Sequence, residues 1–315
     1  MQRKNWTMLI FLFCFLLLSI VLSTAIGASG LSLLDLDPDT VRMLLFDVRL
    51  PRVLAALLVG AGLAVAGAAM QGLFKNAMAD PYIIGTSSGG ALGASLSIVL
   101  FTGFGLPVFA FVGATASTVL VYLISRRNGR VAVETLLLSG IAVSMFLSAF
   151  LSFIMYMSGK SLHQIMFWLM GGFWNISWSD VWIGLLLLPA CLVLFLFARD
   201  LNVISIGEED AVHLGVDVEK LKFALLLLSS FITGIAVSVA GSIGFIGLIV
   251  PHLMRILVGP DHRILIPSAM MAGAALLVWA DTLVRILPTE IPVGIVTSFF
   301  GAPFFIYLLR SRTRT

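Results

Sequence analysis

The stretch RVLAALLVGAGLAVAGAAMQ occupies residues 52–71 of this 315-residue chain. After its first residue it contains no Asp, Glu, Lys or Arg. Its length suits a crossing of the hydrocarbon layer, because a transmembrane helix needs about 20 mostly apolar residues. Gly60, Gly62 and Gly67 lie within it, and small residues allow helices to approach closely in lipid. The stretch therefore predicts a transmembrane helix that packs tightly against its neighbours.

The composition of the whole chain matches this stretch. Hydrophobic residues make up 60% of the sequence, charged residues only 11%, and the mean hydropathy is +1.09. Soluble domains contain about 45–50% apolar and about 25% charged residues. The composition excludes a soluble enzyme and, despite a pI near 9.1, a nucleic-acid-binding chain. We predict an all-α polytopic membrane protein that forms a single transmembrane domain over residues 1–315.

Long charge-free windows divided at turn signals predict about ten transmembrane helices. The first is expected to be an uncleaved helix rather than a signal peptide, because its apolar run is long for a signal peptide. The aromatic segment 163–178, divided by Gly171 and Gly172, predicts an outer interfacial helix instead of a full crossing. The predicted spans are 8–27, 52–71, 82–101, 106–125, 134–157, 181–198, 222–242, 244–258, 265–286 and 292–309.

The distribution of basic residues predicts the orientation. Ten spans place both termini on one side, and fourteen of the nineteen Lys and Arg residues fall on that side. Cytoplasmic loops are enriched in Lys and Arg, so both termini are predicted to be cytoplasmic. The inner residues are Arg3, Lys4, Lys75, Arg126, Arg127, Arg130, Arg199, Lys220, Lys222, Arg255, Arg263, Arg310, Arg312 and Arg314; the outer ones are Arg42, Arg49, Arg52, Lys160 and Arg285.

Small residues also suggest how the bundle is organised. Gly85, Gly89 and Gly93 form a stripe at four-residue steps, which predicts close helix packing or a mobile centre of the bundle. Residues 65–73 and 239–248 share a Val-Ala-Gly start and a later Gly-Leu pair. Because their helices run in opposite directions, they are consistent with an inverted repeat, an arrangement found in many transporters.

The sequence contains no cluster typical of catalysis or metal binding. Its four histidines lack metal-ligand spacing, Cys14 and Cys191 lie in apolar runs, and no phosphate-binding loop is present. The span interiors are nearly free of ionisable groups, apart from Asp281 and Arg285, whose spacing allows an ion pair on one helical face. We therefore expect no catalytic residue, no metal site and no cofactor in this chain, and an energy source on a partner.

The cytoplasmic loop at about 200–221 has the pattern of an ordered element. Acidic residues follow Gly207, where a helix N-terminus favours negative charge, and Gly215 is placed to end that helix. Asp217 can cap a second short helix. The loop predicts two short helices that project into the cytoplasm and fit a partner protein.

Four stretches resemble the FecCD/BtuC-type permease subunits of type II ATP-binding-cassette importers, which take up iron–siderophore complexes, haem and cobalamin. The resemblance covers almost the whole chain. It implies a BtuC-like permease fold and a homodimer or paired permease in the cytoplasmic membrane of a prokaryote. It also implies an ATPase dimer that uses ATP and Mg²⁺, and an extracytoplasmic substrate-binding protein. The four stretches are RLPRVLAALLVGAGLAVAGAAMQGLFKNAMADPYIIG (49–85), IGEEDAVHLGV (206–216), GFIGLIVPHLMRILVGPDHR (244–263) and ADTLVRILPTEIPVGIVTSFFGAPFFIYLL (280–309).

The same resemblance assigns roles to particular residues. The segment from Gly207 is similar to the element that couples the permease to its ATPase, and Arg49, Arg52 and Arg285 match outer arginines that dock the binding protein. The 75–81 stretch is similar to one near the cytoplasmic gate, with Ala77 in place of the usual proline. The implied coupling residues are Gly207, Glu208, Ala211, Leu214 and Gly215, and the implied gate or pathway residues are Asn76, Met78, Gly85 and Gly89.

The cargo is left open by these residues. An iron(III)–siderophore complex is the first expectation, and cobalamin or haem is the alternative. A self-powered secondary transporter is opposed by the bare span interiors, and a membrane enzyme or scaffold by the missing catalytic cluster.

Overall fold

The computed structural model describes residues 2–27, 37–127, 130–287 and 289–312. The described chain is almost entirely helical, with one short antiparallel strand pair that joins Arg126 to Val131. Arg314, one of the basic residues predicted to be cytoplasmic, lies outside the described residues. The elements in chain order are α1 (Gln2–Ala25), α2 (Pro38–Met43), η2 (Leu44–Arg49), α3 (Leu50–Leu73), η3 (Pro81–Ile84), α4 (Thr86–Phe101), α5 (Leu106–Ser125), β1 (Arg126–Arg127), β2 (Arg130–Val131), α6 (Val133–Met157), η4 (Gly159–Ser161), α7 (Leu162–Met170), α8 (Trp178–Leu185), α9 (Leu187–Leu196), α10 (Ala198–Ile206), α11 (Glu208–His213), α12 (Val218–Ala240), α13 (Ile246–Val258), α14 (His262–Ile286) and α15 (Val293–Arg312).

The predicted set of ten spans is confirmed in helix number and position. Seven described helical stretches are long and apolar enough to cross a membrane, and three shorter apolar helices complete the ten: α4, α13 and the Val293–Ile306 part of α15. The span predicted at 106–125 coincides with α5. The span predicted at 181–198 consists of two consecutive helices, α8 and α9.

Two predicted boundaries are wrong. The second crossing begins well before residue 52, because α2, η2 and α3 form one helical stretch from Pro38 to Leu73. Pro51 lies in the first turn of α3 and has no backbone N–H to donate to the preceding turn. The wider π-helical turn of η2 comes directly before α3. The outer interfacial helix α7 is shorter than 163–178 and ends at Gly171, whose φ of +68° suits glycine.

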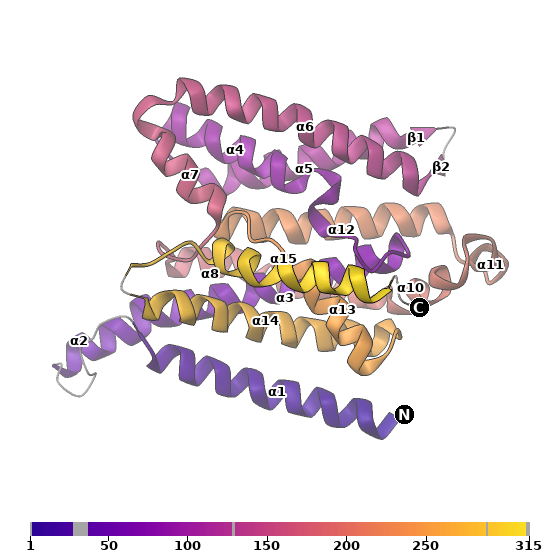
Figure 1. The fold of residues 1–315 in the computed structure, drawn as a ribbon, viewed down its shortest axis with the longest axis horizontal. Coiled ribbons are helices and arrows are strands. Elements are labelled where there is room, and N and C mark those ends of the chain that lie inside the picture. The colour runs from indigo at the N-terminus through magenta and orange to yellow at the C-terminus, as the bar shows by residue number, and fades with distance from the viewer. Residues whose placement is uncertain (1, 28–36, 128–129, 288, 313–315) are drawn as a thin grey trace.

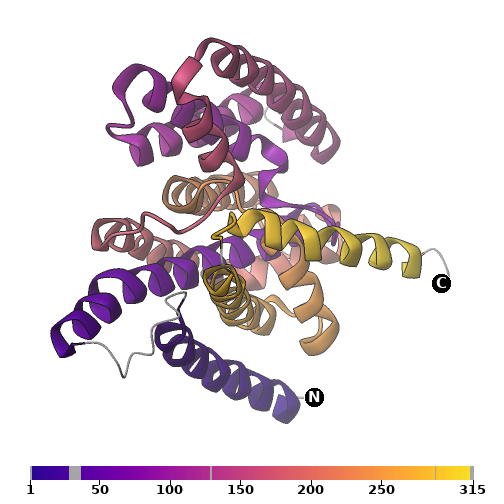
Figure 2. The ribbon, with the colours of Figure 1, turned by 60° about the vertical axis from the view of Figure 1, so that its left-hand side comes forward.

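The helices form layers on both sides of α12. The helices α4, α5 and α6 pack together on one side, while α3, α13, α14 and α1 lie on the other (Figures 1 and 2). The N-terminal end of α1 and the C-terminal end of α15 both lie on the side where α11 and the β1–β2 hairpin lie, and α2 lies at the opposite end (Figure 1). This common side agrees with an even number of crossings, and the positive-inside rule makes it cytoplasmic.

Small residues bring the central helices into backbone contact. A methyl group at Gly67 of α3 would overlap the carbonyl oxygen of Gly247 in α13, and one at Gly89 of α4 would overlap that of Gly113 in α5. The glycine stripe at Gly85, Gly89 and Gly93 therefore serves helix packing between α4 and α5. The inverted repeat stays a prediction.

Candidate functional site

The cytoplasmic projection, residues 198–217, is built from α10, α11 and the turn after α11 (Figure 1). Glu208, Glu209 and Asp210 occupy the first turn of α11, where the helix dipole favours negative charge. Gly215 has φ +83°, which ends α11 as predicted. Asp217 does cap a helix, but the expected second short helix is wrong: the residues after Asp217 are the first turn of the long α12. The short helices are α10 and α11.

The projection exposes large apolar side chains outside the spans. Ile206 is 70% exposed, Val212 60% and Leu214 65%. Large apolar side chains exposed outside the membrane spans are typical of protein contact sites. Leu214 is one of the implied coupling residues, whereas Ile206 and Val212 were missed. Apolar residues inside a charged loop were the sequence signal that could have identified them.

The other implied coupling residues have different environments. The side chain of Ala211 is completely buried and packs the projection against the bundle. Glu208 forms an ion pair with Lys222 of α12, with Oε2 2.8 Å from Nζ. Gly207 has extended backbone that any residue can adopt. The five residues thus lie together in the projection, and the exposed members at its surface are Leu214 and Gly215.

Two of the outer arginines, Arg52 and Arg285, lie in a buried ion cluster, and Arg49 is also buried. Arg52 donates from Nε to both carboxylate oxygens of Asp281, at 3.0 and 3.1 Å. Arg285 Nε lies 3.0 Å from Asp281 Oδ2, which confirms the predicted ion pair within α14. Arg52 Nη1 also contacts Glu290, whose side chain is 40% exposed. Arg52 is buried because its counter-ion Asp281, 229 residues away in the sequence, lies against it.

Arg49 and Arg285 attach α1 to the bundle. Arg49 donates to the carbonyl oxygen of Ala25 at 2.8 Å, and Arg285 donates to the carbonyl oxygen of Ser23 at 3.1 Å. Ser23 also hydrogen-bonds Thr282 of α14 through their hydroxyl groups. These contacts satisfy the last carbonyl groups of α1, which have no partners within the helix.

The turn after α3 and the start of α4 hold the implied gate residues. Asn76 is exposed and its Oδ1 accepts a hydrogen bond from the backbone N–H of Met78 at 3.0 Å. Gly85 and Gly89 are buried against α5, and the Gly85 carbonyl accepts from Ser117 Oγ at 2.8 Å. The structure thus places Asn76 and Met78 at the cytoplasmic end and the two glycines inside the α4–α5 contact, so the four do not form one cluster.

Side-chain contacts join the end of α3, η3 and the start of α4 to the α12–α13 segment and the first turn of α13. Gln71 donates to the carbonyl oxygen of Leu248 at 2.9 Å, and Tyr82 Oη donates to that of Ile243 at 3.1 Å. Ser87 and Ser242 share a hydroxyl hydrogen bond of 2.9 Å. The cytoplasmic turn and the α12–α13 break therefore form one connected unit.

Asp80 in this turn has an altered proton affinity. Burial raises the pKa of its carboxyl group to about 6, although the backbone N–H of Tyr82 donates to it. Since the folded state then binds the proton more tightly than the unfolded chain, the contribution of Asp80 to stability is highest at low pH and falls as the pH rises from about 4 to about 6. His262, whose pKa is lowered by burial to about 4, contributes in the opposite direction. The contribution of Asp80 is therefore measured as the difference in melting temperature between the wild type and a variant that cannot ionise at residue 80.

An Asp80→Asn variant is expected to flatten this pH dependence, because the amide keeps an acceptor for Tyr82 but cannot ionise. Melting curves between pH 4 and pH 7.5 check it. The matched control is Asp210→Asn at an exposed site of α11, which should keep the wild-type profile. An unchanged slope in Asp80→Asn would show that another group causes the dependence.

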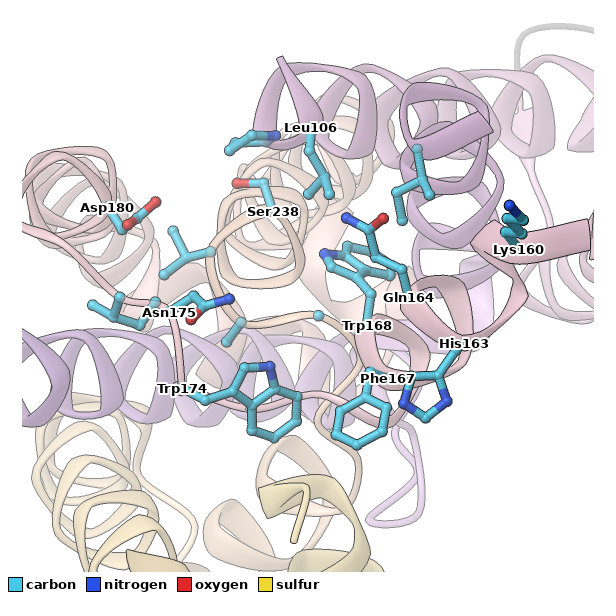
Figure 3. A pocket seen from close by; sticks show the side chains of 17 residues that line it. Leu106, Lys160, His163, Gln164, Phe167, Trp168, Trp174, Asn175, Asp180 and Ser238 are labelled. Atoms are coloured by element: carbon cyan, nitrogen blue, oxygen red, sulfur yellow. The ribbon is translucent and has the colours of Figure 1, made fainter. Parts of the chain in front are cut away.

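An outer cavity of about 630 Å³ lies at the end opposite to the projection, between α7, the start of α5 and the end of α12 (Figure 3). Its aromatic wall contains Phe167, Trp168 and Trp174, and the Phe167 and Trp174 rings meet edge to face at 5.6 Å. The polar side chains of its lining are Lys160, His163, Gln164, Asn175, Asp180 and Ser238. An aromatic wall combined with polar side chains is typical of sites for organic ligands.

The described residues contain no group of three or more His, Cys, Asp or Glu side chains that could hold a metal ion. Cys14 and Cys191 are both free thiols.

Comparison with known proteins identifies the family. Residues 3–311 match the FecCD transport family. The chain is 48% identical to the cobalamin import system permease protein BtuC of Halobacterium salinarum, over 87% of this chain and 75% of that protein. It is 43% identical to the hemin transport system permease protein HmuU of Yersinia pestis, over 96% and 95%. A solved structure described as an inward-facing metal-chelate type ABC transporter superposes with a TM-score of 0.89 at 36% identity, covering 97% of this chain and 99% of that one. These matches confirm the resemblance seen in the four stretches, and the chain belongs to the FecCD transport family.

Proposed function

We propose that this chain is the permease subunit of an ATP-binding-cassette importer that moves a metal chelate across the cytoplasmic membrane of a prokaryote. The observation that carries the proposal is the cytoplasmic projection, with Ile206, Val212 and Leu214 exposed beside an acidic helix. A partner ATPase would cover these apolar side chains. The sequence has no phosphate-binding loop of its own, so a partner must supply the energy.

A secondary transporter is less well supported. A coupling ion needs an ionisable group that can bind and release it within the spans. Asp281 is the acidic side chain buried in α14, and two arginines neutralise it. Ion coupling at this position would first require both ion pairs to break.

A second permease copy would complete the assembly. Phe299 and Phe300 of α15 are strongly exposed, and so are Phe146, Phe150 and Phe153 of α6. Lipid can cover such side chains, but a conduit for a bulky cargo needs more than the packed interior of one bundle. We propose that an identical or homologous permease lies beside this chain, and that an extracytoplasmic binding protein delivers the cargo to the outer face.

For the cargo we propose a metal-bound tetrapyrrole in preference to an iron(III)–siderophore complex. The two relatives described above are named for cobalamin and hemin, which both contain such a macrocycle. The aromatic wall of the outer cavity supports this choice, because a conjugated ring system can stack on Phe167 or Trp174.

Reconstitution tests both the proposed importer function and the proposed cargo. The permease is placed in proteoliposomes with its ATPase and binding-protein partners, and uptake of cobalamin, hemin and a ferric siderophore is compared. We expect ATP-dependent uptake of a tetrapyrrole. Uptake that persists without ATP would refute the proposal of an ATP-driven importer. ATP-dependent uptake of the siderophore alone would refute only the proposal of a tetrapyrrole cargo.

The outer cavity gives a separate prediction. Trp174→Ala is expected to lower the uptake rate about 2–10-fold at limiting cargo, because one aromatic contact contributes about 0.5–1.5 kcal/mol. Trp174→Phe should retain most of the rate. The matched control is Trp182→Ala, which removes an exposed tryptophan of α8 that does not line the cavity. Equal uptake rates in Trp174→Ala and the wild type would show that the outer cavity is not part of the cargo route.

A further inference from the structure

Lys222 is a basic residue whose charge is buried at the cytoplasmic end of α12. Its side chain is only 5% exposed, whereas that of its neighbour Lys220 is 86% exposed. A buried ammonium group is costly unless acceptors surround it. The environment of Lys222 therefore needs a specific explanation.

The acceptors of Lys222 come from three different elements. Nζ lies 2.8 Å from Glu208 Oε2 of α11, 3.3 Å from Glu219 Oε1 of α12 and 3.1 Å from the carbonyl oxygen of Val131 in β2. The second Glu219 oxygen accepts the backbone N–H of Val131 at 2.9 Å. Both backbone polar groups of Val131 are thus bound to this charge cluster, which we call the Lys222 junction: Glu208, Glu219, Lys222 and Val131.

The Lys222 junction connects the projection to the start of α6. Val131 ends the hairpin whose first strand follows α5, and α6 begins two residues later at Val133. From there α6 runs to Met157 and contacts α7, which lines the outer cavity. At about 1.5 Å per residue, the 25 residues of α6 span the membrane as one rigid rod.

We propose that Lys222 is a positioning residue that transmits movement of α11 to α6 and so links the projection to the outer cavity. This inference rests on the proposed function, since it assumes that a partner moves α11. Glu208 then acts inside the junction instead of touching the partner, and Val212 and Leu214 provide the contact surface. In this proposal the β1–β2 hairpin connects the projection to the layer of α4, α5 and α6, so that this layer moves when the projection moves.

Two substitutions separate transmission from folding. Lys222→Met removes the buried charge, and Glu208→Gln leaves the Lys222–Glu219 pair in place while it removes the ion pair to α11. The matched control is Lys220→Met, which removes an exposed lysine two residues away. In proteoliposomes with the partner ATPase, we expect both junction variants to bind the ATPase and hydrolyse ATP, with cargo moved per ATP at least fivefold lower. Lys220→Met should match the wild type, and Lys222→Arg should restore part of the ratio.

A measurement without transport tests the same junction. Spin labels are attached at His213→Cys in α11 and Arg127→Cys in β1, both exposed, after Cys14→Ser removes the exposed native thiol. The distance distribution should be narrow in the labelled parent and clearly broader with Glu208→Gln. Should Lys222→Met fail to fold, Glu208→Gln decides both experiments.

The outcomes for the two proposals are distinct. If Glu208→Gln changed neither the transport-to-ATP ratio nor the distance distribution, the proposed role of the Lys222 junction would be wrong. ATP-dependent transport by the wild-type protein would still support the importer function in that case. Absence of ATP-dependent transport in the wild type would overturn the importer, and the distance distribution would still decide whether the junction joins α11 to the hairpin.

Discussion

Asp281→Ala is expected to lower the free energy of unfolding by about 3–5 kcal/mol, the cost of leaving buried charges without their counter-ion. The Asp281 side chain is 1% exposed, and both Arg52 and Arg285 bind its carboxylate at 3.0 Å. Without it, two guanidinium groups repel each other between α3 and α14. Thermal unfolding of the detergent-purified protein, followed by size-exclusion chromatography after heating, measures the loss.

Glu290→Gln is the matched control for Asp281→Ala. Glu290 also binds Arg52, at 3.1 Å, but its side chain is 40% exposed. Exposed ion pairs contribute about 0–1 kcal/mol, so this variant should melt close to the wild type. If Asp281→Ala and Glu290→Gln had equal, small effects, the buried cluster would not stabilise the contact of α3 with α14.

This cluster affects how the docking proposal for Arg49, Arg52 and Arg285 must be tested. Charge reversal at Arg52 would break the buried pair with Asp281, so a loss of docking could follow from a loss of structure. Glu290→Gln avoids this problem, because it frees Arg52 Nη1 while the Asp281 contacts stay in place. Docking of an acidic binding protein through Arg52 would become tighter in that variant.

Much of the fold could be predicted because lipid imposes simple rules on each segment separately. The bounds of α5 were predicted to the residue: Gly105 with φ +67° precedes Pro107 at its start, and charged Arg126 follows its end. The number of crossings and their orientation follow from apolar length and the side of each basic residue in the same way.

The candidate sites were less predictable because they depend on partners that are distant in the sequence. Arg52 and Asp281 are 229 residues apart, so no local pattern could show that Arg52 is buried in an ion pair. Lys222 was counted only as an inner basic residue. A local signal did exist: Val218, Leu221 and Leu225 recur at helical spacing on one face of α12, and Lys222 lies on the same face, so its burial could have been predicted.

The projection gives the prediction with the largest effect on transport. Leu214→Asp, or the double variant Val212→Asp and Leu214→Asp, places negative charge on the apolar surface that we assign to the ATPase. A central apolar contact contributes about 2 kcal/mol or more to such an interface, which corresponds to a roughly 30-fold weaker complex. Co-purification of the ATPase should be lost, and ATP-dependent uptake should fall to background.

The fold should tolerate these substitutions because both side chains point into solvent, at 60% and 65% exposure. An unchanged melting temperature is therefore part of the expected result and distinguishes them from Asp281→Ala. Glu209→Gln is the matched control, since it alters an exposed residue of the same helix without touching the apolar surface. If the ATPase still co-purified with Val212→Asp and Leu214→Asp, its contact would have to lie elsewhere on the cytoplasmic side, and α11 would lose the role proposed for it.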